Sequence, residues 1–394
     1  MFSDYRVNAL QKSKTLSIRN AMKSLLMGGA CLLALAQPGQ AIETTAREAY
    51  LIDYTTKTVL INKDAEKPMP PASMSKIMTA YMVFERLKDG RLSLDDKLPV
   101  SEKAWRKGGS KMFVEVGTEI SIYDLLRGII VQSGNDACIV VAEGLGGSEE
   151  NFAQEMTLKA REIGLENSSF ANATGWPDPN QRMTPKDLAT LADRIITDFP
   201  EYYSVYSEKS FTWSGIKQDN RNPLLYRNLG ADGLKTGHTE EAGYGLTSSA
   251  KQGDRRIILV LNGMKSAKER SEESARLVSW AFREFDNFEL FKAGETVDTA
   301  DVWLGTEKTI DLVPEEDLLL TLPKNAKNKM TATVSYVGPI QTPIEQGERL
   351  GTLKIEAPDI DTVEIPLVAA NSVEREGGFS RIVSALNYLI FGKS

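Results

Sequence analysis

The chain has very few of the residues on which many hydrolase active sites depend. Among 394 residues there is one histidine, His238, and there are two cysteines, Cys31 and Cys138. A single histidine argues against a Ser-His-Asp triad, in which histidine is the base, and against a zinc hydrolase, whose metal is usually held by several side chains including histidines. Any activated nucleophile in this chain is therefore expected to use a different base, and we expect no metal and no cofactor.

Long apolar runs are also missing. The longest stretch near the N-terminus lies between Leu25 and Ala36, follows basic residues from Arg6 to Lys23, and precedes small residues that end at Ala41. A membrane-spanning helix needs about 20 apolar residues, whereas a secretory leader has this shorter arrangement. We therefore expect residues 1–41 to be a signal peptide that is removed on export, with an uncleaved anchor as the alternative.

Removal of that leader would change the cysteine content and the charge. Cys31 would be lost, which leaves Cys138 alone and excludes an intramolecular disulfide. Five basic residues and one acidic residue would leave with it, so 42 basic residues would face 53 acidic ones and the net charge would fall from −7 to −11. Such a charge implies no basic face for nucleic acid. Export without disulfides fits a bacterial periplasm or cell surface.

Residues 42–288 combine helix and strand patterns. A hairpin pattern over 50–61 is followed by amphipathic helices, and the last helix is expected over 267–288. Three strands are expected shortly before that helix, over 233–239, 244–250 and 256–262. Helices gathered between an N-terminal hairpin and later antiparallel strands favour an α+β domain.

The composition changes near Leu290. Over residues 289–372 no helical period persists, and short runs of β-favouring residues alternate with Gly, Pro and Asn turns. This pattern predicts a small all-β domain. It carries no cluster of catalytic residue types, so we interpret it as a spacer or interaction module.

The last segment, residues 373–394, ends in an amphipathic pattern. One face of a helix there would carry only apolar side chains: Phe379, Ile382, Val383, Leu386, Leu389 and Ile390. At about 14 residues such a helix is too short to span a bilayer but long enough to lie in its interface. We expect a modest anchor on the periplasmic face of the inner membrane. Packing on the β domain and a dimer contact are the alternatives.

The strongest functional hypothesis begins at Ser73. Ser73 and Lys76 are three residues apart at the start of an expected helix, so their side chains share one face about one turn apart. A serine hydroxyl is a weak nucleophile until a base accepts its proton, and a lysine that burial keeps neutral can be that base. Taken alone, a helix cap followed by a surface lysine is the simpler explanation.

Ser133 and Asn135 form the second candidate motif, Ser-Gly-Asn, at an expected helix end. The Ser133 hydroxyl could relay a proton between Lys76 and another cation. The Asn135 amide could hold Lys76 and also bind a substrate amide, because it carries both donors and an acceptor. A simple turn would explain the tripeptide equally well.

A Lys-Thr-Gly tripeptide, residues 235–237, forms the third motif in an expected strand. Lys235 would supply positive charge, Thr236 a hydroxyl for a carboxylate, and Gly237 a bare position that lets substrate backbone approach closely. Each tripeptide is weak evidence alone, but the three occur here in one order in one chain, which is a strong signal.

Together the three motifs resemble those of a known family. Pro71–Lys76, Gln132–Ala137 and Gly233–Thr239 are similar to the low-molecular-mass penicillin-binding D-alanyl-D-alanine carboxypeptidases of Gram-negative bacteria, the penicillin-binding protein 5 type. The resemblance covers essentially the whole mature chain. It implies a β-lactamase/transpeptidase-like catalytic domain, an all-β domain and an amphipathic C-terminal helix. It also implies an acyl-serine enzyme that removes the terminal D-Ala from peptidoglycan pentapeptides and is acylated by β-lactam antibiotics.

The resemblance implies a role for each matching residue. Ser73 would be the nucleophile and Lys76 its base, while Ser133 and Asn135 would complete the proton relay. The residues that would bind substrate are Lys235, Thr236, Gly237, His238 and Arg221. The backbone N–H groups of Ser73 and His238 would form the oxyanion hole. Arg270 is a weaker candidate beside the substrate carboxylate, and for it a surface salt bridge is the favoured alternative.

Three other functions remain open at this point. A class A β-lactamase needs an acid that acts on a water, and no glutamate between Asn135 and Lys235 stands in a convincing loop of that type. A murein DD-endopeptidase shares every catalytic motif, and the all-β domain with its tail argues against it. A non-catalytic penicillin-binding scaffold is disfavoured by the intact motif residues.

Two segments depart from the family pattern. The segment 173–180 differs from the sequence expected in the family, and the segment 221–235 looks one residue shorter than its family counterpart. Both differences could reshape the rim of the pocket.

Overall fold

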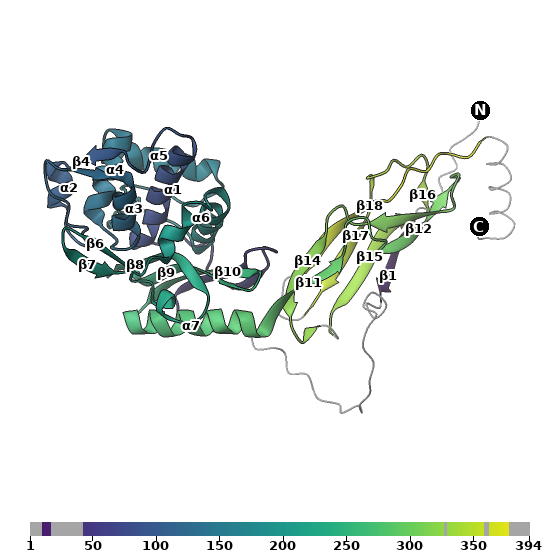
Figure 1. Cartoon of the computed structure of the whole chain (residues 1–394). Coiled ribbons are helices and arrows are strands. Elements are labelled where there is room, and N and C mark those ends of the chain that lie inside the picture. Colours follow the sequence, from purple (N-terminus) through teal and green to yellow (C-terminus); the bar gives the residue numbers. More distant parts are fainter. Residues whose placement is uncertain (1–9, 17–41, 327–328, 358–361, 378–394) are drawn as a thin grey trace, which may run out of the picture. The chain divides into compact units, whose positions relative to one another are not determined.

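The computed structural model describes residues 10–16, 42–326, 329–357 and 362–377. They form two compact units (Figure 1). The mixed unit consists of residues 42–283, and the β unit consists of residues from 284 onward together with the N-terminal strand 10–16.

A five-stranded antiparallel sheet lies at the centre of the mixed unit, in the order β3-β2-β10-β9-β8. Its strands are β2 (Glu48–Asp53), β3 (Val59–Lys63), β8 (Ala231–Thr239), β9 (Gly243–Gln252) and β10 (Arg255–Met264). The predicted hairpin and the three predicted later strands are confirmed. Because β2 pairs with β10, the two ends of the unit meet in one sheet.

The two faces of this sheet pack against different helices. Tyr50 and Ile52 of β2 belong to the core that contains α1 (Lys76–Lys88), whereas Ala49 and Leu51 belong to the core that contains α7 (Ala267–Glu284). This alternation follows from the two-residue period of a strand. Figure 1 shows α7 along one face of the sheet and the other helices of the unit gathered over the opposite face.

The helical layer is built from segments with clear start signals. Ser121 and Thr184 accept hydrogen bonds from the backbone N–H of Asp124 and Asp187, so both act as N-caps. The helices are α2 (Glu102–Arg106), α3 (Ile122–Ile130), α4 (Asn135–Gly146), α5 (Glu149–Glu162) and α6 (Pro185–Asp198), with short 3-10 turns η2 (Ala72–Ser75), η3 (Tyr203–Ser207) and η4 (Pro223–Tyr226). Two small two-stranded sheets were not predicted: β4 (Lys97–Pro99) with β5 (Glu119–Ser121), and the hairpin of β6 (Ser210–Trp213) with β7 (Ile216–Asp219).

The last helix of the mixed unit ends earlier than the sequence predicted. Helix α7 ends at Glu284, and the residues that follow form β11 (Phe285–Phe291). This strand pairs antiparallel with β14 (Leu318–Pro323). The prediction of helix to residue 288 was wrong because the pairing partner lies about 30 residues further on, where a local period cannot reveal it.

The β unit contains a seven-stranded sheet in the order β1-β15-β17-β18-β13-β12-β16. Its strands are β1 (Leu10–Leu16), β12 (Asp298–Trp303), β13 (Thr309–Val313), β15 (Thr331–Gly338), β16 (Ile340–Gln341), β17 (Arg349–Glu356) and β18 (Val363–Ala369). Val334, Leu353 and Leu367 lie fully buried in its core. The all-β prediction is confirmed, although β11, β13 and β16 were missed.

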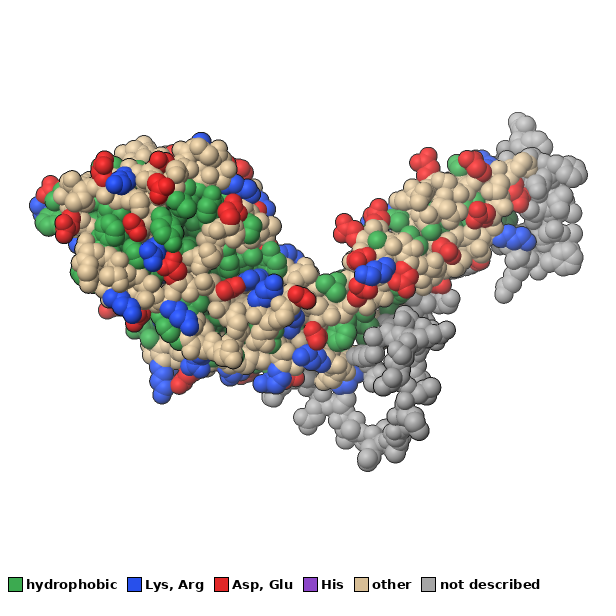
Figure 2. Space-filling model, in the orientation of Figure 1, with side chains coloured by type: hydrophobic (Ala, Val, Ile, Leu, Met, Phe, Trp, Pro, Cys, Tyr) green, Lys and Arg blue, Asp and Glu red, His purple; other side chains and the backbone are tan. Residues whose placement is uncertain are grey.

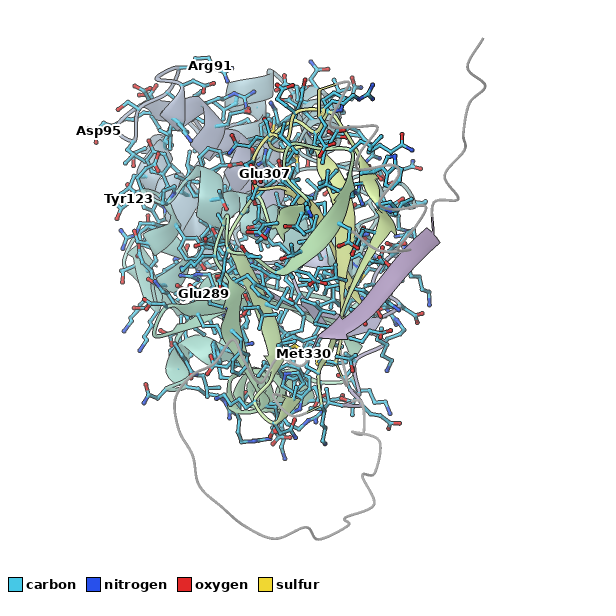
Figure 3. All side chains as sticks on the ribbon, turned by 90° about the vertical axis from the view of Figure 1, so that its right-hand side faces the viewer. Arg91, Asp95, Tyr123, Glu289, Glu307 and Met330 are labelled. Carbon is cyan, nitrogen blue, oxygen red and sulfur yellow. The ribbon has the colours of Figure 1, made fainter. Side chains whose placement is uncertain are left out.

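Strand β1 was not expected, because its residues belong to the predicted leader. It pairs antiparallel with β15 from Leu10 opposite Gly338 to Leu16 opposite Ala332, and Figure 3 shows it as the outermost strand of the sheet. Without it β15 would be an edge strand, and an unpaired edge readily accepts another extended segment. Most of the predicted leader lies outside the described residues, and so does the predicted amphipathic helix.

On the face that Figure 2 shows, basic and acidic side chains are interspersed over both units. Within the described residues, no helix is both long enough and apolar enough to cross a membrane.

Candidate active site

Ser73 lies in the 3-10 turn η2, which leads directly into α1. The preceding residue, Ala72, has a φ of 48°, in the left-handed region that residues other than glycine seldom adopt. Strained backbone of this kind costs about 1–3 kcal/mol and concentrates at functional sites. Ser75 donates a hydrogen bond to the Ala72 carbonyl at 3.0 Å, which closes the turn. The partly exposed Ser73 side chain does not cap a helix.

Lys76 is the first residue of α1 and is only 1% exposed. Its Nζ lies 2.8 Å from the Ser73 Oγ and 2.8 Å from the Asn135 Oδ1, and it also donates to the backbone carbonyl of Thr174. No carboxylate forms an ion pair with Lys76 among the residues that the structure describes. The surface-lysine alternative is therefore wrong, and the amine that faces Ser73 is a buried one.

Burial lowers the pKa of Lys76 to about 8, and the positive charges of Arg221 and Lys107 act in the same direction. The ordinary lysine pKa is near 10.4, at which an amine is almost entirely protonated at neutral pH. A pKa near 8 raises the neutral fraction at pH 7 to roughly one tenth. The site thus supplies a lysine that can accept the Ser73 proton.

Asn135 begins α4 and fixes the second motif in place. Its Nδ2 donates to the Gly108 carbonyl at 2.9 Å while its Oδ1 accepts from Lys76, which is the contact that the sequence suggested. Ser133 has a φ of 61°, and its buried Oγ has no hydrogen-bond partner within the described chain. The expected link from Ser133 to Lys76 is therefore not formed here, and its relay role stays a prediction.

Asp136 organises this region, and this role was not predicted from the sequence. Its carboxylate accepts backbone hydrogen bonds from Met112, Phe113, Val114 and Ala137 at 2.8–3.2 Å. Four such donors satisfy a buried carboxylate without a cation. Asp136 therefore ties the segment 112–114 to the start of α4.

Lys235, Thr236 and Gly237 lie on β8, with Lys235 only 3% exposed. Burial, followed by the charges of Lys76 and Arg221, holds the pKa of Lys235 well below its usual range. A Cβ at Gly237 would lie 2.8 Å from the Pro71 carbonyl oxygen. The bare position therefore admits the chain's own nucleophile turn, and the approach of substrate backbone stays a prediction.

His238 and Arg221 lie at the exposed rim of the same region. The His238 ring packs on Tyr244 with centroids 3.9 Å apart. Arg221 follows β7, and its Nη1 donates to the Ser110 Oγ at 2.7 Å. Neither forms an ion pair with an acid in the part of the chain that is described.

Arg270 does not form the surface salt bridge that was the favoured explanation for it. It is only 8% exposed, has no acidic partner among the described residues, and its Nε has no hydrogen-bond partner there. Its guanidinium lies 5.6 Å from the Tyr244 ring centroid and donates weakly, at 3.4 Å, to the Arg221 carbonyl. Burial, with a further contribution from Arg221, lowers the pKa of Arg270 to about 10. The salt-bridge prediction is wrong.

The site therefore gathers cations without matching anions. Lys235 and Arg270 are buried, Arg221 lies at the rim, and the charges of Arg221 and Arg270 both reach Lys235. A buried charge without a partner is costly, so a group of them favours an anionic ligand. A substrate carboxylate is such a ligand.

The segment 172–176 forms the wall next to Lys76, and its role was missed. The Asn172 Oδ1 accepts from the backbone N–H groups of Thr174 and Trp176, and its Nδ2 donates to the Trp176 carbonyl at 3.0 Å. A Cβ at Gly175 would lie 1.9 Å from the Ala72 carbonyl oxygen, so only glycine fits there. The contact from this segment to Lys76 is the Thr174 carbonyl, not a carboxylate of the kind that a class A β-lactamase would need.

Comparisons with known proteins agree with this site. The sequence matches the D-alanyl-D-alanine carboxypeptidase family of S11 peptidases over residues 34–266 and the C-terminal domain of penicillin-binding protein 5 over residues 285–375. It is 36% identical to the D-alanyl-D-alanine carboxypeptidase DacC of Escherichia coli strain K12, covering 92% of this chain and 94% of that protein.

Solved structures give the same result. The chain resembles the D-alanyl-D-alanine carboxypeptidase DacD of Francisella tularensis with a TM-score of 0.80 and 32% identity, covering 88% of this chain and 98% of that one. It resembles penicillin-binding protein 5 of Haemophilus influenzae with a TM-score of 0.74 and 34% identity, covering 87% and 100%. Penicillin-binding protein D2 of Listeria monocytogenes, solved in an ampicillin-bound form, is 30% identical with a TM-score of 0.57, covering 62% and 100%. The chain therefore belongs to the D-alanyl-D-alanine carboxypeptidase family of serine peptidases.

Proposed function

We propose that the chain removes the terminal D-Ala from peptidoglycan pentapeptide stems through an acyl intermediate on Ser73. One observation carries this proposal: a buried lysine with a pKa of about 8 lies 2.8 Å from the hydroxyl of the candidate nucleophile. That arrangement activates a serine without histidine.

In the acylation step the Ser73 Oγ attacks the carbonyl carbon of the penultimate D-Ala. Neutral Lys76 accepts the hydroxyl proton, and the negative charge that develops on the carbonyl oxygen is stabilised by the backbone N–H groups of Ser73 and His238. The C–N bond then breaks, and the leaving amine of the terminal D-Ala takes up a proton delivered from Lys76 through Ser133. The product is an ester between Ser73 and the shortened peptide.

Deacylation reverses the roles. A water attacks the ester carbonyl, Lys76 accepts its proton, and the Ser73 Oγ regains a proton as it leaves. A β-lactam would enter by the same acylation, because its strained amide opens onto Ser73. It would remain bound as long as this second step is slow.

The terminal carboxylate of the substrate belongs beside Lys235, Thr236 and Arg221, with Arg270 behind them. A carboxylate next to Lys235 favours the charged form of that amine and raises its pKa. Binding of the substrate and protonation of Lys235 therefore support each other. This coupling accounts for a lysine whose pKa is held low by burial.

The proposed location is the periplasm. Residues 1–41 would direct export, residues 42–283 would form the catalytic domain, and the β unit from residue 284 to residue 372 would act as a spacer. Residues 373–394 would attach the enzyme peripherally to the inner membrane, since the apolar positions of 379–390 follow one helical face. A chain that ends at residue 378 should stay soluble and keep full activity, whereas membrane sedimentation of that chain would contradict the anchor.

The activity is tested by free D-Ala release from a murein pentapeptide, with a cross-linked dimer as a parallel substrate. We expect release from the pentapeptide and an intact dimer. Dimer cleavage would instead show an endopeptidase, and penicillin labelling without release from either would show a scaffold. Ser73→Ala should abolish both release and labelling, and Ser204→Ala, at an exposed serine of η3, is the matched control for the nucleophile.

A further inference from the structure

The loop 107–111 joins the cation-rich end of the site to an aromatic side chain at the other end. Ser110 accepts the hydrogen bond from Arg221, so this part of the loop borders the proposed carboxylate site. The Gly108 carbonyl accepts from Asn135, and a Cβ at Gly109 would lie 3.0 Å from the Trp176 ring. If the terminal carboxylate lies at Arg221, the peptide that precedes the scissile bond leaves past Asn135 toward Trp176.

The backbone of Trp176 is held in place although the residue faces solvent. Trp176 is 44% exposed, while its backbone N–H donates to the Asn172 Oδ1 and its carbonyl accepts from the Asn172 Nδ2. Gly175 presses the same backbone against the nucleophile turn. An exposed tryptophan on a held backbone offers a large contact area, and its two side-chain torsions keep the cost in conformational entropy small.

Lys107 adds an uncompensated charge beside this ring. Its Nζ lies 4.8 Å from the Trp176 ring centroid, and it forms no ion pair with any acid among the described residues. Its charge reaches far enough into the site to lower the pKa of Lys76. By contrast Lys103, four residues earlier, pairs with both Glu149 and Glu150. The cation next to Trp176 is therefore available to a ligand.

We propose that Trp176 and Lys107 form a subsite for the residue that precedes D-Ala–D-Ala, and that this subsite favours a side chain ending in a free carboxylate. The aliphatic part of that side chain would lie on the indole, and its carboxylate would pair with the Lys107 amine. Trp176 lies in the segment 173–180, and Lys107 begins the loop 107–111 that contacts its ring. This inference rests on the proposed carboxypeptidase activity and adds the class of stem peptide to it.

The test compares two synthetic substrates, Nα-acetyl-α-aminopimelyl-D-Ala-D-Ala and the same peptide with its side-chain carboxylate converted to the carboxamide. The full chain should hydrolyse the carboxylate form with a kcat/KM about three- to five-fold higher, the size expected for a partly exposed ion pair. Lys107→Gln should bring the ratio of the two kcat/KM values to about one. Because any change in the pKa of Lys76 affects both substrates equally, it cancels in this ratio.

Two controls make the result specific. Lys251→Gln removes the same charge at the far end of β9 and should keep the wild-type ratio, and raised salt should lower that ratio toward one. Trp176→Ala should raise KM for both substrates by roughly five- to ten-fold, whereas Trp176→Phe should keep most of the affinity.

A wild-type ratio near one, or a ratio that Lys107→Gln leaves unchanged, would overturn the subsite. Failure of the proposed function looks different, because neither peptide would then release D-Ala with any variant.

Discussion

The two units differ in the polar groups that they bury. The mixed unit buries Lys76, Lys235 and Arg270, and none of these cations pairs with a carboxylate among the described residues. It also buries the Ser133 hydroxyl, which has no hydrogen-bond partner there. In the described part of the β unit, the buried polar side chains are Thr321 and Thr342. Both threonines are satisfied, one by Asn287 at 2.8 Å and the other by backbone carbonyls at 3.1 Å.

This difference shows where each unit keeps its function. Burying an unpaired cation costs several kcal/mol, and a fold that retains such groups is holding them for a ligand or a reaction. The mixed unit carries that cost around Ser73. The β unit has an ordinary apolar core, so any role it has in binding must belong to its surface.

The largest expected effect tests whether the buried Lys76 of the mixed unit serves catalysis. Lys76→Met keeps the length of the side chain but removes the amine, and D-Ala release should fall by about 10²- to 10⁴-fold. Lys251→Met is the matched change at an exposed position and should leave the rate unchanged. Single-turnover acylation measures the effect directly, and a loss of less than ten-fold would remove Lys76 from the base role.

The next effect concerns the core of the β unit. Leu353 is fully buried on β17, so Leu353→Ala should destabilise that unit by about 2–5 kcal/mol through lost burial and a residual cavity. Calorimetry should show a lower unfolding temperature for one transition, while the transition that β-lactam acylation shifts should stay in place. Loss of D-Ala release at temperatures where the mixed unit stays folded would show that the units depend on each other.

The smallest effect is the pH dependence of stability. The folded pKa of Lys76 is lowered to about 8 from 10.5, and that of Lys235 is lowered as well, so the unfolded chain binds more protons above pH 8. Stability of the mixed unit should therefore rise between pH 8 and pH 10, by up to about 3 kcal/mol from Lys76. Lys76→Met should reduce this rise. A rise of equal size in the β unit would contradict the assignment to these lysines.

Helices and strands whose signals lie within their own residues could be predicted from the sequence. The Ser121 and Thr184 caps marked the starts of α3 and α6, and period-two patterns marked β8 to β10. The contact of Lys76 with Ser73 and Asn135 could also be predicted from the motifs, because each of the three residues stands at or near a helix start. What the sequence could not give was β11, whose identity as a strand depends on pairing with β14 far along the chain.

Site residues that depend on contacts between distant segments could not be predicted from the sequence either. Arg270 looked like a surface residue because its helix, α7, has acidic neighbours on every side in sequence, yet tertiary packing buries it away from them. Asn172 and Gly175 were missed because their role is to fit the backbone of one loop against the turn of another. Only the fold brings those two segments together.

The most direct test of the account is the pH dependence of Ser73 acylation by benzylpenicillin, followed by intact-protein mass spectrometry with Ser73→Ala as the blank. A neutral Lys76 as base predicts an acylation rate that rises with pH and levels off with an apparent pKa near 8. A rate that stays flat from pH 6 to pH 9.5, or covalent label on the Ser73→Ala chain, would contradict it.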